Sequence, residues 1–143
     1  MTTQRGIIKS GEEIELIRQS SRIVAETLKL LESRIKPGVT TLELDRMAEE
    51  FIRSRGGVPS FKGYRGFPAS ICTSVNSEVV HGIPGNRVLE EGDIISIDVG
   101  VFKDGYHGDG AATFGVGAIS EEAKPVSYTH LRAHETRHDL VCR

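Results

Sequence analysis

Apolar residues early in the chain recur at alternating spacings of three and four, which is typical of amphipathic helices. The first such stretch follows the capping-box pair Ser10 and Glu13 and ends at the Lys-Pro-Gly sequence of residues 36–38. Its repeating positions are Ile14, Ile17, Ser21, Val24, Leu28, Leu31 and Ile35. The second follows the capping-box pair Thr40 and Glu43, ends at about the next Gly-Gly pair, and contains Leu44, Met47 and Phe51. The pattern predicts two helices that each pack one face on a sheet.

From Val58 onward the chain is rich in glycine, proline, aromatic and β-branched residues. Strand-like runs cover residues 70–75, 93–102 and 106–116, and a third helix is predicted to begin at about Ser120. Helices followed by consecutive strands predict an α+β fold, with two N-terminal helices packed on an antiparallel sheet.

Composition narrows the functional classes. The chain has 143 residues, 38% hydrophobic and 27% charged, as expected for one globular domain. A net charge of −2 gives no basic surface for nucleic acid or anionic membranes, and no apolar run is long enough to span a bilayer. The N-terminus lacks a signal segment, and Cys72 and Cys142 are far apart, so we expect a reduced, cytoplasmic location and no nucleic-acid or membrane partner.

A predicted hairpin places two aspartates on one face. In residues 93–102 the aliphatic side chains alternate with small and polar ones. The Asp-Gly pair at 104–105 favours a two-residue turn, so Lys103 should pair with Tyr106. Asp98 then lies opposite Ala111 and Asp109 opposite Gly100, and the carboxylates are diagonal neighbours with backbones roughly 7 Å apart. A three-residue loop would remove this relation.

At this separation, two carboxylates repel each other unless they are protonated, exposed or bridged by a cation. Aspartate oxygens suit a pair of divalent ions about 3.5 to 4 Å apart that share and activate one hydroxide. We expect Gly100, Gly108 and Gly110 to keep the space above the carboxylates open. The alternative is a solvated hairpin that carries ordinary surface aspartates.

The hairpin sequence, residues 97–114, resembles the first metal-ligand hairpin of methionine aminopeptidases. Three upstream motifs resemble the same family in the same order: Lys-Pro-Gly-Val-Thr-Thr from Lys36, Phe-Pro-Ala-Ser-Ile-Cys-Thr-Ser-Val-Asn from Phe67, and Glu-Val-Val-His-Gly-Ile-Pro from Glu78. The resemblance covers about residues 5–124 and is to the short, bacterial type. It implies the first half of the pita-bread fold that this family shares with creatinase.

The resemblance implies a role for six residues. Asp98 would be a bidentate metal ligand and Asp109 a bridging one. His81 would be catalytic and substrate-binding, because it would hydrogen-bond the scissile peptide and stabilise developing charge. The methionine side chain would be bound by Tyr64, Phe67 and Cys72. Without the resemblance, His81 and the pocket residues are explained by ordinary packing. His107 is a supporting residue.

The implied reaction removes the N-terminal methionine from nascent proteins and peptides, with two divalent ions that could be cobalt, manganese, iron or zinc. Nascent N-termini and a transient ribosome association are the implied partners of a monomeric enzyme. The family's remaining ligands, a histidine and two glutamates, lie in a second half that this sequence lacks. We therefore expect the chain itself to be inactive and poorly soluble.

Residues 125–143 differ in composition from the rest and contain a His-Glu-x-x-His zinc-protease pattern at His134 and His138. Little sequence follows for a third ligand, so we expect a non-native or frameshifted tail after a domain of residues 1–124. Two other interpretations of the chain remain. One is a prolidase or aminopeptidase P, which normally has an extra N-terminal domain, and the other is a non-catalytic pita-bread binding module.

Overall fold

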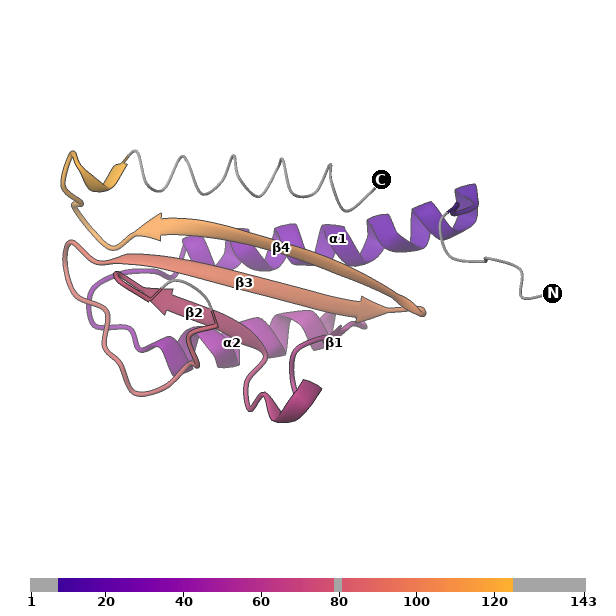
Figure 1. Ribbon diagram of the computed structural model, residues 1–143, viewed down its shortest axis with the longest axis horizontal. Coiled ribbons are helices and arrows are strands. Elements are labelled where there is room, and N and C mark those ends of the chain that lie inside the picture. The colour runs from indigo at the N-terminus through magenta and orange to yellow at the C-terminus, as the bar shows by residue number, and fades with distance from the viewer. Residues whose placement is uncertain (1–7, 79–80, 125–143) are drawn as a thin grey trace.

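The computed structural model describes residues 8–78 and 81–124 as two helices packed on an antiparallel sheet, which confirms the predicted α+β class (Figure 1). Within these residues, no helix is long and apolar enough to cross a membrane. The elements in chain order are α1 (Gly11–Glu32), α2 (Thr41–Ser54), β1 (Val58–Pro59), the short 3-10 helix η1 (Tyr64–Gly66), β2 (Ile71–Val75), β3 (Ile94–Lys103) and β4 (Tyr106–Gly115).

Both helices begin at the predicted capping boxes. Ser10 Oγ accepts from the Glu13 amide at 3.2 Å, and the Glu13 carboxylate accepts from the Ser10 amide at 2.7 Å. Thr40 and Glu43 make the same two bonds. Each box satisfies backbone donors that the first turn of a helix leaves without partners, which fixes where the helix starts.

The buried face of α1 agrees in part with the predicted one, since Val24 and Leu31 are buried and Leu28 and Ile35 pack against the core. Ile14 is 46% exposed, whereas the buried residues are Ser20, Ile23, Val24, Thr27 and Leu31. Ser20 and Thr27 are buried because their hydroxyls donate to backbone carbonyls, Ser20 to Tyr106 at 2.9 Å and Thr27 to Ile23 at 2.7 Å. Satisfied hydroxyls can occupy positions that a count of apolar residues assigns to aliphatic side chains.

Strand β3 lies in the middle of the sheet. Strand β4 pairs with one of its edges over the whole length, from Ile94 opposite Gly115 to Lys103 opposite Tyr106. Strands β1 and β2 share its other edge. The pairing of β1 ends with Pro59 opposite Val101, and the pairing of β2 begins with Ile71 opposite Val99. The chain between β1 and β2 therefore leaves the sheet beside Gly100.

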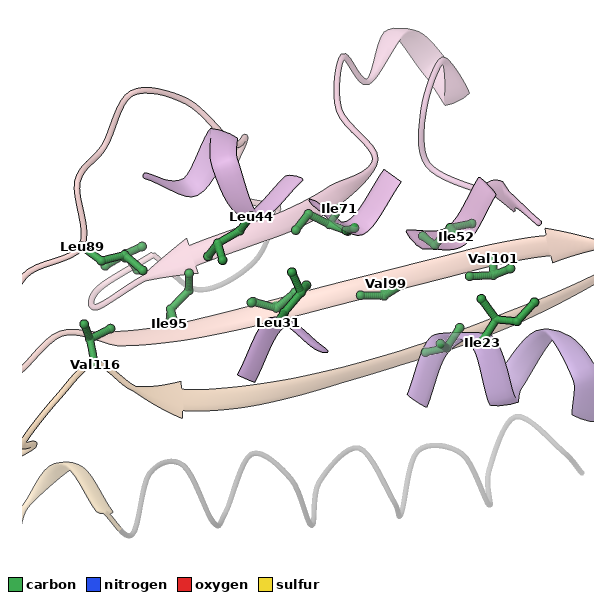
Figure 2. Close-up of a cluster of buried hydrophobic side chains, with 14 residues drawn as sticks. Ile23, Leu31, Leu44, Ile52, Ile71, Leu89, Ile95, Val99, Val101 and Val116 are labelled. Carbon is green, nitrogen blue, oxygen red and sulfur yellow. The ribbon is translucent and has the colours of Figure 1, made fainter. Parts of the chain in front are cut away.

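The core lies between the helices and one face of the sheet (Figure 2). Helix α1 packs on β3 and β4, and α2 packs on β1 and β2. The aliphatic side chains of β3 are fully buried there, as the alternation predicted: Ile95, Ile97, Val99 and Val101. The opposite face of β3 carries Ser96, Asp98 and Gly100 in its middle, with Ile94 and Phe102 toward its ends.

The structure contradicts the predicted role of two glycines. Gly108 and Gly110 pair with Val101 and Val99, so they lie on the face toward α1. A Cβ on Gly108 would lie 2.6 Å from the Ser21 amide nitrogen, and one on Gly110 would lie 3.0 Å from the Val24 side chain. These glycines allow α1 to approach β4 closely, and they do not open space above the carboxylates.

Candidate metal and substrate site

The β3–β4 hairpin turns through Asp104 and Gly105, which have positive φ of 50° and 85°. A two-residue turn with this backbone matches the twist of the flanking strands. The register is the predicted one, with Asp98 opposite Ala111 and Asp109 opposite Gly100. Because opposed residues share a face, both carboxylates lie on the side of the sheet away from the helices. Asp98 is half-buried and Asp109 is exposed.

Cys72 lies directly beside the aspartates. It pairs with Asp98 across β2 and β3, so Cys72, Asp98 and Ala111 form one row over three strands. Burial, together with the negative charges of Asp98 and Asp109, raises the pKa of the Cys72 thiol to about 11. The thiol is therefore protonated at neutral pH, and both carboxylates act on the same small region of the sheet.

The donor chemistry of this face fits a divalent cation. Two carboxylates offer the oxygen ligands that manganese and similar ions accept, and a cation would relieve their repulsion. Among the residues that the structure describes, no group of three or more His, Cys, Asp or Glu side chains is arranged to hold a metal ion. Asp98 and Asp109 by themselves could supply only part of a coordination shell.

The segment after β1 covers this face beside Asp109. The Ser60 amide donates to the Gly100 carbonyl at 2.9 Å, and Ser60 Oγ lies 2.9 Å from His107 Nδ1. The Phe61 ring lies over Gly100, where a Cβ would be 2.8 Å from the ring. Ser60 and Phe61 are site residues that the sequence analysis missed, because only the strand order brings them to Gly100.

The predicted pocket residues are only partly brought together. Phe67 is half-buried and packs edge-to-face on Phe61, with ring centroids 6.5 Å apart. The Tyr64 ring is 64% exposed, and the Arg65 guanidinium lies 5.4 Å from its centroid. The structure therefore groups Phe61, Phe67 and Cys72 near the aspartates and leaves Tyr64 largely in solvent.

His81 lies along the outer edge of β2. The next residue, Gly82, accepts a hydrogen bond from the Thr73 amide at 2.9 Å and donates to Ser74 Oγ at 3.2 Å. Ser74 shares the face of Cys72, since the two are two residues apart in a strand. His81 is exposed and has a φ of 60°. The residue after His81 is thus bonded to β2, the strand that carries Cys72. The histidine pair of the tail motif, His134 and His138, lies outside the described residues.

Comparison with known sequences identifies the family. The sequence profile of metallopeptidase family M24 matches residues 15–141. The chain belongs to this family. A metallopeptidase family implies a divalent metal cofactor, in agreement with the carboxylate pair of the hairpin.

Individual relatives show which members of the family this chain resembles. A methionine aminopeptidase of Clostridium acetobutylicum is 63% identical over 118 residues, which are 82% of this chain and 47% of that protein. The crystal structure of methionine aminopeptidase from Rickettsia prowazekii superposes with a TM-score of 0.83 and 38% identity, covering 85% of this chain and 49% of that one. An Xaa-Pro dipeptidase from Bacillus anthracis superposes with a TM-score of 0.68 and 26% identity, covering 83% of this chain and 32% of that one.

These matches confirm the predicted resemblance to bacterial methionine aminopeptidases and the pita-bread fold. The chain spans about half the length of the methionine aminopeptidases from Clostridium acetobutylicum and Rickettsia prowazekii that it matches.

Proposed function

We propose that this chain supplies the first half of the active site of a methionine aminopeptidase. The observation that carries the proposal is the hairpin register, which puts Asp98 and Asp109 on one face beside Cys72. Relatives at 63% identity are named methionine aminopeptidases, whereas the Xaa-Pro dipeptidase of the same fold is 26% identical. The likeness therefore favours an N-terminal methionine over an Xaa-Pro bond, and the carboxylates favour an enzyme over a binding module.

Asp98 and Asp109 would hold two divalent metal ions, and their oxygen ligands accept cobalt, manganese, iron or zinc. When bound, such ions activate a water molecule and polarise the scissile carbonyl. His81 would hydrogen-bond the substrate peptide and stabilise the charge that develops on it. Its position beside β2, next to the row that contains Cys72, supports this role.

Phe67 and Cys72 would bind the methionine side chain, together with Phe61. Aromatic rings and a neutral thiol suit an unbranched thioether, because sulfur packs well against ring edges and a charged pocket would disfavour it. The raised pKa of Cys72 supports a neutral thiol at this position. Tyr64 would have to turn from solvent toward the substrate to take part.

The substrates would be nascent polypeptides and peptides that begin with methionine. A cytoplasmic, monomeric enzyme with a transient ribosome association fits this substrate, and the net charge of −2 gives no reason to expect nucleic acid as a partner.

The test is divalent-metal binding, measured by equilibrium dialysis against Mn²⁺ for the chain and for three variants. Asp98→Asn and Asp109→Asn should each weaken binding at least about tenfold, because each removes a charged ligand. Asp104→Asn is the matched control, since it removes a carboxylate from the same hairpin at the turn, where Asn also tolerates positive φ. Equal binding by all three variants would contradict the proposal.

With only two carboxylate ligands among the described residues, the chain alone should not hydrolyse a Met-Gly peptide. Methionine release by the purified chain, inhibited by a chelator, would contradict this expectation. We also propose that residues 125–143 are a tail foreign to the domain of residues 1–124. Sequencing the DNA beyond the Lys124 codon in all three frames tests this, because a continuation that encodes a histidine and two glutamates in family-like motifs would support it.

A further inference from the structure

A carboxylate is buried on the sheet-facing side of α2. Asp45 is 6% exposed, and its Oδ1 accepts two backbone hydrogen bonds, from the Ser70 amide at 2.8 Å and the Ile71 amide at 3.0 Å. Burial raises the pKa of Asp45 although both hydrogen bonds act in the opposite direction. A charged group in such a place is costly unless it makes specific bonds, so its contacts need an explanation.

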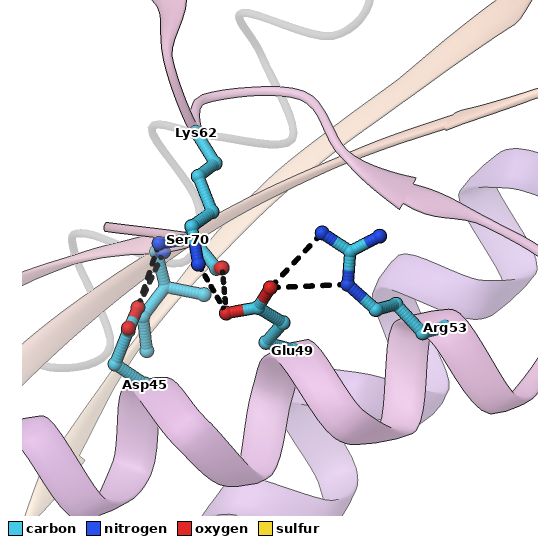
Figure 3. Close-up of polar contacts among 6 residues, drawn as sticks. Asp45, Glu49, Arg53, Lys62 and Ser70 are labelled. Carbon is cyan, nitrogen blue, oxygen red and sulfur yellow. Dashed lines mark hydrogen bonds and ion pairs between the residues drawn. The ribbon is translucent and has the colours of Figure 1, made fainter. Parts of the chain in front are cut away.

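Glu49, one turn further along α2, binds the same segment. Its Oε2 accepts from Lys62 Nζ at 2.7 Å and from Ser70 Oγ at 3.1 Å, while Oε1 accepts from Arg53 at 3.0 Å (Figure 3). The two carboxylates, four residues apart, therefore contact both ends of the chain between β1 and β2.

The segment that they hold has little regular structure of its own. Between Phe61 and Ser70 the only helical turn is η1. Three residues of the segment have positive φ: Gly63, Arg65 and Gly66. Phe61 and Phe67 lie in this segment, and Cys72 follows the Ile71 amide by one residue. The backbone hydrogen bonds that the segment makes within itself all join residues between Phe61 and Phe67. Contacts with α2 are therefore well placed to fix the stretch from Phe67 to Cys72.

We propose that Asp45 and Glu49 are positioning residues that hold Phe67 and Cys72 in the arrangement needed to bind a methionine side chain. The proposal rests on the proposed function, because it assigns these residues to the same pocket. Both residues lie on α2, which packs on the core side of the sheet, whereas Asp98 and Asp109 lie on the other side. They would therefore not touch the substrate. Asp45 fixes the start of β2, and Glu49 fixes Lys62, so together they set both ends of the pocket segment.

The test uses the alkylation rate of Cys72 in the folded chain, with Cys142→Ser so that Cys72 is the single thiol. Asp45→Ala leaves two buried amides without an acceptor, so the segment should open more often and alkylation should accelerate on the order of ten- to a hundredfold. Asp45→Asn keeps the oxygen that accepts both bonds and should restore a slow rate. Ser20→Ala is the matched control, because it removes a part-buried bond between α1 and β4 that does not involve the segment.

A second readout separates this proposal from the proposed function. Free L-methionine should protect Cys72 from alkylation in the wild-type and Asp45→Asn chains but not in Asp45→Ala, while Mn²⁺ binding stays the same in all three. If methionine fails to protect the wild-type chain, the assignment of Phe67 and Cys72 to a methionine pocket fails. The alkylation rates still decide whether Asp45 positions the segment.

Two results would overturn the positioning role. One is an Asp45→Ala rate no faster than wild type, and the other is an equal acceleration by Ser20→Ala. If Asp45→Ala does not fold, the milder Ser70→Ala variant replaces it, because it removes only the bond from Ser70 Oγ to Glu49 and should accelerate alkylation by a smaller factor. An unchanged rate in that variant would then contradict the proposal.

Discussion

The two faces of the β3–β4 hairpin are built from alternate residues of the same strands, yet they differ in almost every property. Toward α1 lie Ile97 and Val99, fully buried, with Gly110 opposite Val99. Away from α1 lie Asp98 and Asp109, which repel each other when no cation is bound. The first face gains stability from apolar burial, whereas the second gives up stability to keep charged groups together. Such a sacrifice is typical of functional sites.

The surroundings of Gly108 and Gly100 also differ between the two faces. On the helix side, a Cβ at Gly108 would meet the backbone of Ser20 and Ser21, which cannot move without shifting α1. On the carboxylate side, a Cβ at Gly100 would meet the Phe61 ring and the Ser60 side chain. Space at Gly108 is therefore limited by the backbone of α1, whereas space at Gly100 is limited mainly by the Phe61 ring.

The largest expected effect is that of Ile97→Ala on the helix side. Removing a fully buried aliphatic side chain should lower the free energy of unfolding by about 2 to 5 kcal/mol. Urea unfolding followed by circular dichroism measures it. Ser96→Ala, the neighbour on the opposite face, loses a hydroxyl that lies 2.8 Å from Thr113 Oγ1 and should cost only about 0.5 to 1.5 kcal/mol. Equal losses would mean that the two faces do not differ as argued.

Gly108→Ala should have the next largest effect. The added methyl group would overlap the α1 backbone, and overpacking of this kind costs about 1 to 3 kcal/mol. At Gly100 the same change should cost less, because the Phe61 ring can rotate away. The ratio of the two losses in urea unfolding is the measurement. A larger loss at Gly100 than at Gly108 would contradict the assignment of rigid and adjustable neighbours.

The sequence predicted the parts of the fold that depend on local signals. Capping boxes gave the helix starts, and the Asp-Gly turn gave the register that brings Asp98 and Asp109 to one face. The expected role of Gly108 was wrong because strand alternation puts it on the face opposite Asp109.

Contacts between distant segments were not predictable. Phe61 reaches Gly100 only because β1 and β2 share one edge of β3, and Asp45 reaches Ser70 only once α2 has packed on the sheet. One signal was present: Asp45 precedes Ala48 by three residues and Ile52 by seven, so helical periodicity places a charge on the buried face of α2.

Asp109→Asn should change stability least and yet separate the two faces most clearly. Without metal, an exposed carboxylate that repels Asp98 contributes little, so the free energy of unfolding should stay within about 0.5 kcal/mol of wild type. Mn²⁺ at a hundred times its dissociation constant should stabilise the wild-type chain by about 2.7 kcal/mol, because it binds the folded state. A variant that binds Mn²⁺ tenfold more weakly should gain only about 1.4 kcal/mol at that concentration. A metal-free variant as unstable as Ile97→Ala would instead make Asp109 a structural residue, and the contrast between the faces would be lost.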